Sequence, residues 1–181
     1  MSTAGAGALA LALLLLCQAT SIATAQAAPF VPTSFTVPTN VTLGPYTLTK
    51  VDPRFSEQDY RALMRARHYI RRQLGSEWPE EDFTIAASRQ TLADDVLRFD
   101  ARESFTYHVL QGAHVIGCVY VLPPSNGEVD ASLFVWTDPT HLAEAQFDDL
   151  REIVHRWLLV DWGLGRIDRS LNAVTSALEN T

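Results

Sequence analysis

Histidines and cysteines are the side chains of this sequence best suited to bind a metal ion or to act as nucleophiles. None of the five histidines stands in a motif such as His-Glu-x-x-His, and two cysteines are too few for a thiolate-rich zinc site. His108 and His114 flank an expected turn, which leaves a shared metal or proton-transfer role as an alternative. Cys118 lies in an apolar stretch and is expected in the core. No Gly-x-Ser-x-Gly sequence occurs, which argues against a serine hydrolase. The sequence therefore predicts no metal site.

Arginines and aromatic residues offer a second kind of chemistry, ligand binding. One face of an expected helix over residues 57–74 is basic, and it could hold an anion, although a solvated face paired with carboxylates is the simpler interpretation. That face carries Arg61, Arg65, Arg67, Arg71 and Arg72. Three aromatic residues could line a ligand cleft, with core packing as the alternative for the tyrosines: Trp78, Tyr107 and Tyr120.

Composition limits the class of protein. The chain has 181 residues, which fits one domain. It carries 14 Lys and Arg against 21 Asp and Glu, a net charge of −7, whereas a nucleic-acid surface needs clustered positive charge. The apolar fraction of 47% argues against a disordered chain. Two cysteines cannot build a disulfide framework.

The N-terminal segment resembles a secretory signal. Residues 4–17 contain only Ala, Gly, Leu and a final Cys, and this run is shorter than the ~20 apolar residues that a bilayer requires. Small residues follow, and we expect cleavage after Ala27. An uncleaved anchor or a disordered tail is the alternative. The sequence thus predicts an exported protein, periplasmic or secreted, without stable membrane insertion after cleavage.

The remaining chain divides into a linker and a folded domain. We expect a Pro- and Thr-rich linker over residues 28–45, since four of the nine prolines lie there, and a single domain over 46–181. Ser56 is expected to cap the first helix, with Asp59 completing an approximate capping box. Periodicity and turn residues predict a strand at 46–51, helices at 57–74 and 86–102, strands at 105–110, 113–122 and 128–137, a long helix opening at 138–140, and a short strand within 166–174. This order indicates an α/β domain with a mostly antiparallel sheet.

Several short sequences, read in this order of elements, resemble the GNAT-type N-acetyltransferases, and in particular a group of bacterial members. The matching stretches are Trp78-Pro79, Phe83-Thr84, the Phe-Thr-Tyr-His-Val-Leu strand at 105–110, the Gly-Cys-Val-Tyr-Val-Leu-Pro sequence at 117–123, and the strand at 128–136. The similarity spans about residues 51–167. The resemblance implies the GNAT-like acyl-CoA N-acyltransferase fold.

The resemblance also implies an activity, transfer of an acetyl group from acetyl-CoA to a small-molecule or peptide amine. In the superfamily, a splayed strand offers backbone N–H groups to the thioester and the pantetheine arm. By position, Val135, Trp136 and Thr137 would bind the cofactor in this way. Glu128 or Asp130 would be the catalytic base, with two solvated residues beside a turn as the alternative.

Two departures from the superfamily pattern leave a second function open. The stretch 137–144 has no glycine and so lacks the Gly-rich phosphate loop. Asp138 and Glu144 bring negative charge to this stretch, and Pro139 removes an N–H donor. Superfamily members usually continue through another helix, which often carries a tyrosine acid, and two strands, whereas this sequence has no tyrosine after Tyr120 and stops at Thr181. The C-terminal acceptor wall is therefore expected to be missing unless another subunit supplies it, as in a homodimer. Acyl-CoA is also a cytosolic metabolite, so an exported enzyme would lack its acetyl donor. The alternative is an exported, non-catalytic GNAT-fold binding domain that has lost the CoA pyrophosphate loop.

Overall fold

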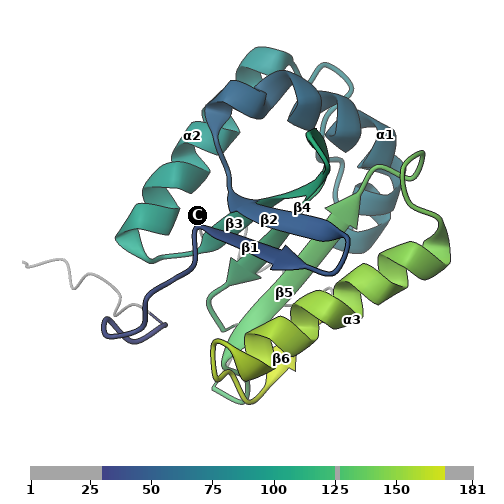
Figure 1. Ribbon diagram of the computed structural model, residues 1–181. Helices are drawn as coiled ribbons and strands as arrows, with labels where there is room; N and C mark the ends of the chain where they lie inside the picture. Colours follow the sequence, from purple (N-terminus) through teal and green to yellow (C-terminus); the bar gives the residue numbers. More distant parts are fainter. Residues whose placement is uncertain (1–29, 125–126, 170–181) are drawn as a thin grey trace, which may run out of the picture.

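A six-stranded sheet in the order β1-β2-β3-β4-β5-β6 forms the centre of the molecule (Figure 1). This computed structural model describes residues 30–124 and 127–169. Neighbouring strands are antiparallel except β5 and β6, which are parallel. The mostly antiparallel α/β architecture predicted from the sequence is therefore confirmed. The elements are β1 (Asn40–Leu43), β2 (Tyr46–Lys50), the 3-10 helix η1 (Pro53–Phe55), α1 (Ser56–Leu74), α2 (Ile85–Ala101), β3 (Phe105–Gln111), β4 (His114–Leu122), β5 (Ala131–Thr137), α3 (Glu144–Val160) and β6 (Ile167–Asp168).

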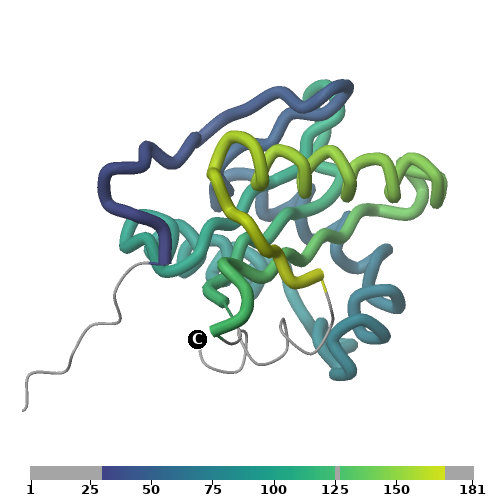
Figure 2. The backbone as a smooth tube through the Cα atoms, turned by 90° about the horizontal axis from the view of Figure 1, so that it is seen from below, coloured from purple at the N-terminus to yellow at the C-terminus, as the bar shows by residue number. Residues whose placement is uncertain are grey.

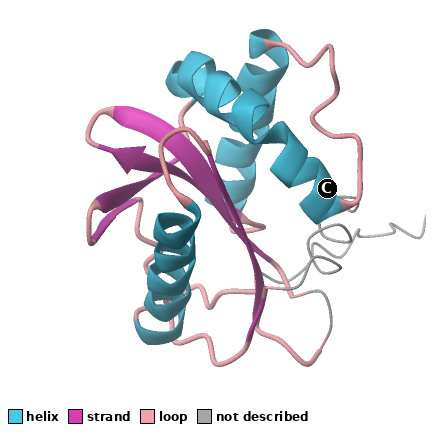
Figure 3. Cartoon of the chain, turned by 90° about the vertical axis from the view of Figure 1, so that its right-hand side faces the viewer, coloured by secondary structure: helices cyan, strands magenta, loops and turns pink. Residues whose placement is uncertain are grey.

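Helices cover both faces of the sheet (Figure 3), with α3 on one side and α1 and α2 on the other. Side chains on a strand point alternately to the two faces, so successive residues of β4 and β5 enter different cores. Val119 and Val135 pack on the α3 side, whereas Cys118 and Trp136 pack on the α1 side. Apolar residues on both faces of β4 and β5 are thus explained by a sheet covered on each side.

The two long edges of β5 differ in their pairing. Along β4 the ladder runs from Gly117–Thr137 to Leu122–Ser132. After α3 the chain turns back toward the sheet (Figure 2), and β6 pairs with β5 at Ala131 and Ser132. Within the described residues, which end at Arg169, no strand pairs with this edge of β5 beyond Ser132.

The segment before β2 is part of the folded structure. Val31 is 1% exposed, and the Arg102 guanidinium donates to the carbonyl oxygens of Pro32 (2.7 Å) and Phe35 (3.1 Å). Residues 40–43, within the predicted linker, form the edge strand β1. The prolines at 38 and 45 flank this strand, and an edge is where a strand beside proline is tolerated. The predicted signal peptide, residues 1–27, lies outside the described residues.

Two elements begin later than the sequence predicted. β5 begins at Ala131 rather than at residue 128, because the Asp130 carboxylate is held by the loop before β6. α3 begins at Glu144 rather than at 138–140, because the Asp138 carboxylate accepts from the Thr140 N–H (2.9 Å) and holds a turn there. Local side-chain hydrogen bonds of this kind compete with regular structure. None of the described helices is both long and apolar enough to cross a membrane.

Candidate active site

The unpaired edge of β5 is the feature around which the candidate site is built. Among the described residues, no strand pairs with this edge beyond Ser132. The Tyr69 hydroxyl, from α1, donates to the carbonyl oxygen of Val135 at 3.5 Å, so this carbonyl points to the open side. The N–H and C=O of one residue in an antiparallel strand point to the same side. The Val135 N–H therefore also faces the open edge.

The residues on either side of Thr137 show the alternation. A Cβ added to Gly117 would lie 2.1 Å from the Trp136 carbonyl oxygen, so that carbonyl faces β4. The Asp138 N–H donates to the Ile116 carbonyl at 2.7 Å, again toward β4. The N–H and C=O of Thr137, which lies between Trp136 and Asp138, consequently face the open edge with those of Val135.

A cavity of about 580 Å³ lies between the second half of α1 and the start of α3. This volume is in the range of small-molecule sites. A recess of about 20 Å³ adjoins it beside β5 and shares Tyr69, Gln73 and Arg151 with it. The cavity is lined by Tyr69, Arg72, Gln73, Thr137, Pro139, Leu142, Ala143, Glu144, Phe147, Asp148 and Arg151, and the recess adds Leu133, Phe134, Val135 and Arg169.

Positive charge and a helix N-terminus both face this cavity. Arg72 comes from α1 and Arg151 from α3, and each lines the wall. The N-cap residue Ala143 has no side chain that could accept from the first N–H groups of α3. A helix N-terminus carries a partial positive charge and favours anions. Glu144 and Asp148 add negative charge to the same wall, and Arg151 lies 3.6 Å from the Asp148 carboxylate.

The sequence places the negative charge of Asp138 in the stretch where a phosphate loop is expected, but in the structure this charge does not face the cavity. Its side chain is 1% exposed and accepts from the Arg65 guanidinium at 2.8 Å and from the Thr140 hydroxyl at 2.7 Å. Burial raises the pKa of Asp138, but the hydrogen bonds from Arg65 and Thr140 outweigh burial and leave the pKa below its usual range. The carboxylate is therefore ionised, and the guanidinium of Arg65 from α1 neutralises its charge.

The structure places the predicted cofactor-binding residues on two sides of β5. Val135 lines the recess and Thr137 lines the cavity. Trp136 is fully buried on the α1 side, and its backbone faces β4. The alternation of the strand separates it from its two neighbours.

The predicted substrate-binding aromatics lie apart from the described lining of the cavity. Tyr107 is fully buried in the core on the α3 side, and its hydroxyl donates to the Pro38 carbonyl at 2.7 Å. Tyr120 and Trp78 pack against the core under α1. Trp78 also contacts the Phe83 ring edge-on, with 6.1 Å between centroids.

The two carboxylates predicted as the catalytic base precede β5, so they do not share a strand face. Asp130 accepts from the N–H groups of Gly165 (2.7 Å) and Arg166 (2.9 Å), and these bonds hold its pKa below the usual range. Glu128 is exposed. Both lie at the end of β5 away from Thr137.

Three residues of the candidate site were missed by the sequence reasoning: Tyr69, Gln73 and Arg151. Tyr69, Arg72 and Gln73 follow the helical spacing of three and four, which places them on one face of α1. That spacing was the available signal. What it could not reveal was that α3 and the end of β5 would close the other side of the cavity.

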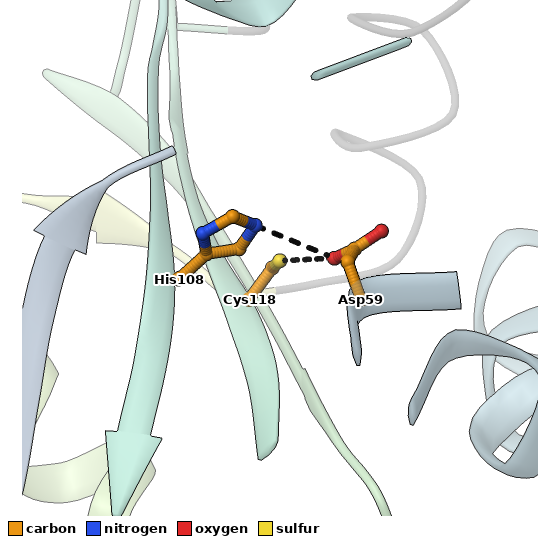
Figure 4. Close-up of side chains that lie close together, drawn as sticks. All are labelled: Asp59, His108 and Cys118. Atoms are coloured by element: carbon orange, nitrogen blue, oxygen red, sulfur yellow. Dashed lines mark hydrogen bonds and ion pairs between the residues drawn. The ribbon is translucent and has the colours of Figure 1, made fainter. Parts of the chain in front are cut away.

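A second polar group lies on the α1 side of the sheet, between α1 and β3–β4, and consists of Asp59, His108 and Cys118 (Figure 4). Asp59 is not the capping residue that the sequence predicted, because its carboxylate accepts from Cys118 and Ser88 in the core. Burial raises the pKa of Asp59 to about 6 and lowers that of His108 to about 4. Cys118 is buried as predicted. His114 is exposed, so the histidines at 108 and 114 do not share a site.

Comparisons with known proteins identify the fold. No protein-family model matches the sequence, and no curated protein matches it either. The ribosomal-protein-S5-alanine acetyltransferase from Vibrio fischeri superposes with a TM-score of 0.56 at 15% identity, over 71% of each chain. A ribosomal L7/L12 alpha-N-protein acetyltransferase in complex with coenzyme A gives 0.51 at 11% identity, over 65% of this chain and 67% of the other. The microcin C7 self-immunity acetyltransferase, in complex with acetyl-CoA and AMP, gives 0.51 at 12% identity over 67% of each chain. The chain therefore has the fold of the GNAT-type acetyltransferases, as its sequence resemblance predicted.

Proposed function

We propose that this protein is an acetyltransferase that binds acetyl-CoA along the open edge of β5 and transfers the acetyl group to an amine. The observation that carries the proposal is that, among the described residues, β6 pairs with β5 no further than Ser132, which leaves the N–H groups of Val135 and Thr137 toward a recess and a cavity. Two of the similar structures are described as complexes with coenzyme A or acetyl-CoA, which supports this choice of ligand.

Successive parts of the acetyl-CoA molecule match the groups that line the recess and the cavity. The pantetheine arm carries amide groups that can pair with the backbone edge at Val135 and Thr137. The phosphates meet the N-terminus of α3, where anions are favoured, and the guanidinium groups of Arg72 and Arg151. These two arginines take the place of the glycine-rich loop that the sequence lacks. Asp138 does not oppose the phosphates, because its charge is neutralised by Arg65.

The reaction requires a proton acceptor for the amine and a proton donor for the thiolate. The amine nitrogen forms the bond to the thioester carbon, the carbon–sulfur bond breaks, and the nitrogen proton passes to a base. Asp130 is tied to two N–H groups and has a lowered pKa, so Glu128 is the better base of the two. Burial raises the pKa of Tyr69, so its hydroxyl stays protonated and is suited to protonate the leaving thiolate.

Binding of acetyl-CoA tests the proposal directly. A ligand at a free concentration of about 100 times its dissociation constant stabilises the native state by about 2.7 kcal/mol. For a chain of this size, this corresponds to a rise in Tm of about 5–11 °C. Arg151→Ala removes a guanidinium from the cavity and is expected to weaken binding about tenfold or more. Arg156→Ala, an exposed arginine of the same helix outside the cavity lining, is the matched control and should bind normally.

Each result of this experiment has a clear meaning. Absence of any Tm shift at millimolar acetyl-CoA and coenzyme A would contradict the proposed site. Binding without acetylation of any amine would leave the alternative of a non-catalytic domain. Equal losses in the Arg151 and Arg156 variants would show that binding depends on general charge and not on the cavity.

We also propose that the protein is exported, with its signal peptide removed after Ala27. N-terminal sequencing of the protein recovered from the cell envelope tests this proposal, and a chain that starts at Met1 or is found in the cytosol would contradict it. The result also decides whether the protein meets cytosolic acetyl-CoA. A homodimer, which the sequence leaves open, is tested by the molar mass in solution.

A further inference from the structure

We propose that Asp59, His108 and Cys118 form a zinc site that fastens α1 to β3 and β4. The three potential ligand atoms all lie within 4.8 Å of one another. His108 and Cys118 are directly opposite partners in the β3–β4 ladder, so their side chains leave the same face of the sheet. α1 packs on this face and directs the Asp59 carboxylate toward both of them (Figure 4). The proposal is independent of the proposed function.

His108 supplies the observation that points to a bound ligand. It is 0% exposed, and neither ring nitrogen has a hydrogen-bond partner among the residues that the structure describes. Its Nε2 lies 3.6 Å from Asp59 Oδ1, beyond hydrogen-bond distance. Buried polar groups in folded proteins are nearly always paired, because leaving one unpaired destabilises the native state. An ion between these atoms would give the imidazole its partner.

The spacing of the ligand atoms fits tetrahedral coordination. With bonds of about 2.3 Å to sulfur and about 2.0 Å to nitrogen and oxygen, neighbouring ligands around zinc lie about 3.3–3.5 Å apart. Asp59 Oδ1 lies 3.3 Å from Cys118 Sγ and 3.6 Å from His108 Nε2. The ligand atoms of His108 and Cys118 lie within 4.8 Å of each other, so these two side chains need to approach each other by at most about 1.3 Å to admit the ion.

The ligand set selects the metal. A thiolate, an imidazole and a carboxylate suit Zn²⁺, whereas Mg²⁺ and Ca²⁺ prefer oxygen ligands. On binding, the zinc–sulfur bond replaces the thiol S–H bond, and the proton passes to solvent without any change of oxidation state. Three protein ligands leave a fourth position for water. All three are buried, so the role is structural.

Ser88 orients the carboxylate from outside the ligand set. Its hydroxyl donates to Asp59 Oδ2 at 3.0 Å and leaves Oδ1 toward His108 and Cys118. Partners of this kind typically change metal affinity about 10–100-fold when removed. The site thereby also couples α2, which carries Ser88, to α1 and the sheet.

The test measures metal binding by the full-length chain under reducing conditions. We expect close to one zinc per chain by elemental analysis, and a rise in Tm of about 8–16 °C at a thousandfold excess of zinc over its dissociation constant. With Co²⁺ in place of zinc, a sulfur-to-cobalt charge-transfer band should appear together with intense d–d bands. Cys118→Ser should abolish the charge-transfer band and weaken zinc binding at least a hundredfold, and Ser88→Ala should weaken it about 10–100-fold.

Matched variants distinguish this site from incidental binding. Cys17→Ser and His114→Gln remove the other cysteine and an exposed histidine of the same hairpin, and both should bind one zinc normally. A wild-type chain with less than a tenth of an equivalent of zinc, no shift in Tm and no cobalt–sulfur band would overturn the proposal, as would full zinc binding by Cys118→Ser. The wild-type measurements decide the question even where a variant fails to fold.

Discussion

The two edges of β5 belong to the same seven residues, but they differ in how far they pair with a neighbouring strand. On the β4 side the ladder is continuous from Ser132 to Thr137. On the β6 side the pairing within the described part of the chain reaches only Ser132, and the edge beyond it faces a recess and a cavity. Backbone alternation assigns Trp136 to the closed side and Val135 and Thr137 to the open side. A single strand thus anchors the fold with one set of peptide groups and leaves the other set available for a ligand.

The difference arises from what lies beside each edge. Gly117 lets the β4 backbone approach β5 closely, with the Trp136 carbonyl where a side chain would stand. On the other side, α3 leads the chain away from Thr137, and the Asp130 carboxylate holds the returning loop at the start of β5. The closed edge depends on a missing side chain, and the open edge depends on where one carboxylate anchors the chain.

The largest expected effect concerns the closed edge. In Gly117→Ala the new Cβ would lie 2.1 Å from the Trp136 carbonyl oxygen and 2.8 Å from the Thr137 Cα, and neither is a flexible side chain that can move away. We expect the free energy of unfolding to fall by about 3 kcal/mol, measured by denaturant unfolding. Gly127→Ala is the control, because nothing lies within 4 Å of its added Cβ, and it should change stability by less than about 0.5 kcal/mol. Equal stability of the two variants would show that the β4–β5 ladder is looser than described.

The next effect concerns the loop that leaves the open edge. Arg65→Met removes the cation that neutralises the buried Asp138 carboxylate and is expected to reduce the free energy of unfolding by about 1–2 kcal/mol, a value lowered because Arg65 is half exposed. The folded-state pKa of Asp138 lies below its unfolded value of about 3.9, so the contribution is complete above about pH 4 and is lost as the pH falls further. The gap between wild type and variant should close in that acidic range.

A neighbouring ion pair provides the control for this effect. Arg61 pairs with Glu57 on the exposed surface of α1, so Arg61→Met should change stability by no more than about 0.5 kcal/mol. A loss in Arg65→Met that persists unchanged down to pH 2 would exclude Asp138 as its cause.

Sequence reasoning reached the fold and the strand of interest but not the site as a whole. The apolar alternation around Cys118 correctly predicted a core position, because burial of a strand is visible in its own residues. Asp59 was interpreted as a helix cap, since a Ser-x-x-Asp sequence is typical of a helix start. The two residues of the group beside its carboxylate, His108 and Cys118, are 49 and 59 residues away in the chain. Only the packing of α1 on the sheet brings them together.

The smallest expected effect concerns Glu144, whose replacement should lower stability and tighten ligand binding. Glu144 lies in the first turn of α3, where its charge favours the helix, but it also lines the cavity proposed for the phosphates. Glu144→Gln should lower the free energy of unfolding by about 0.5 kcal/mol and tighten acetyl-CoA binding about twofold at low salt. Asp149→Asn on the same helix, outside the cavity lining, should leave binding unchanged. Weaker binding by Glu144→Gln would place the phosphates elsewhere.

Amide hydrogen exchange with and without acetyl-CoA tests the central claim, that the open edge of β5 receives the ligand. The N–H groups of Val135 and Thr137 should become protected on addition of acetyl-CoA, whereas the Trp136 N–H, which faces β4, should be protected equally in both states. Unchanged exchange at Val135 and Thr137 under saturating acetyl-CoA would contradict the account.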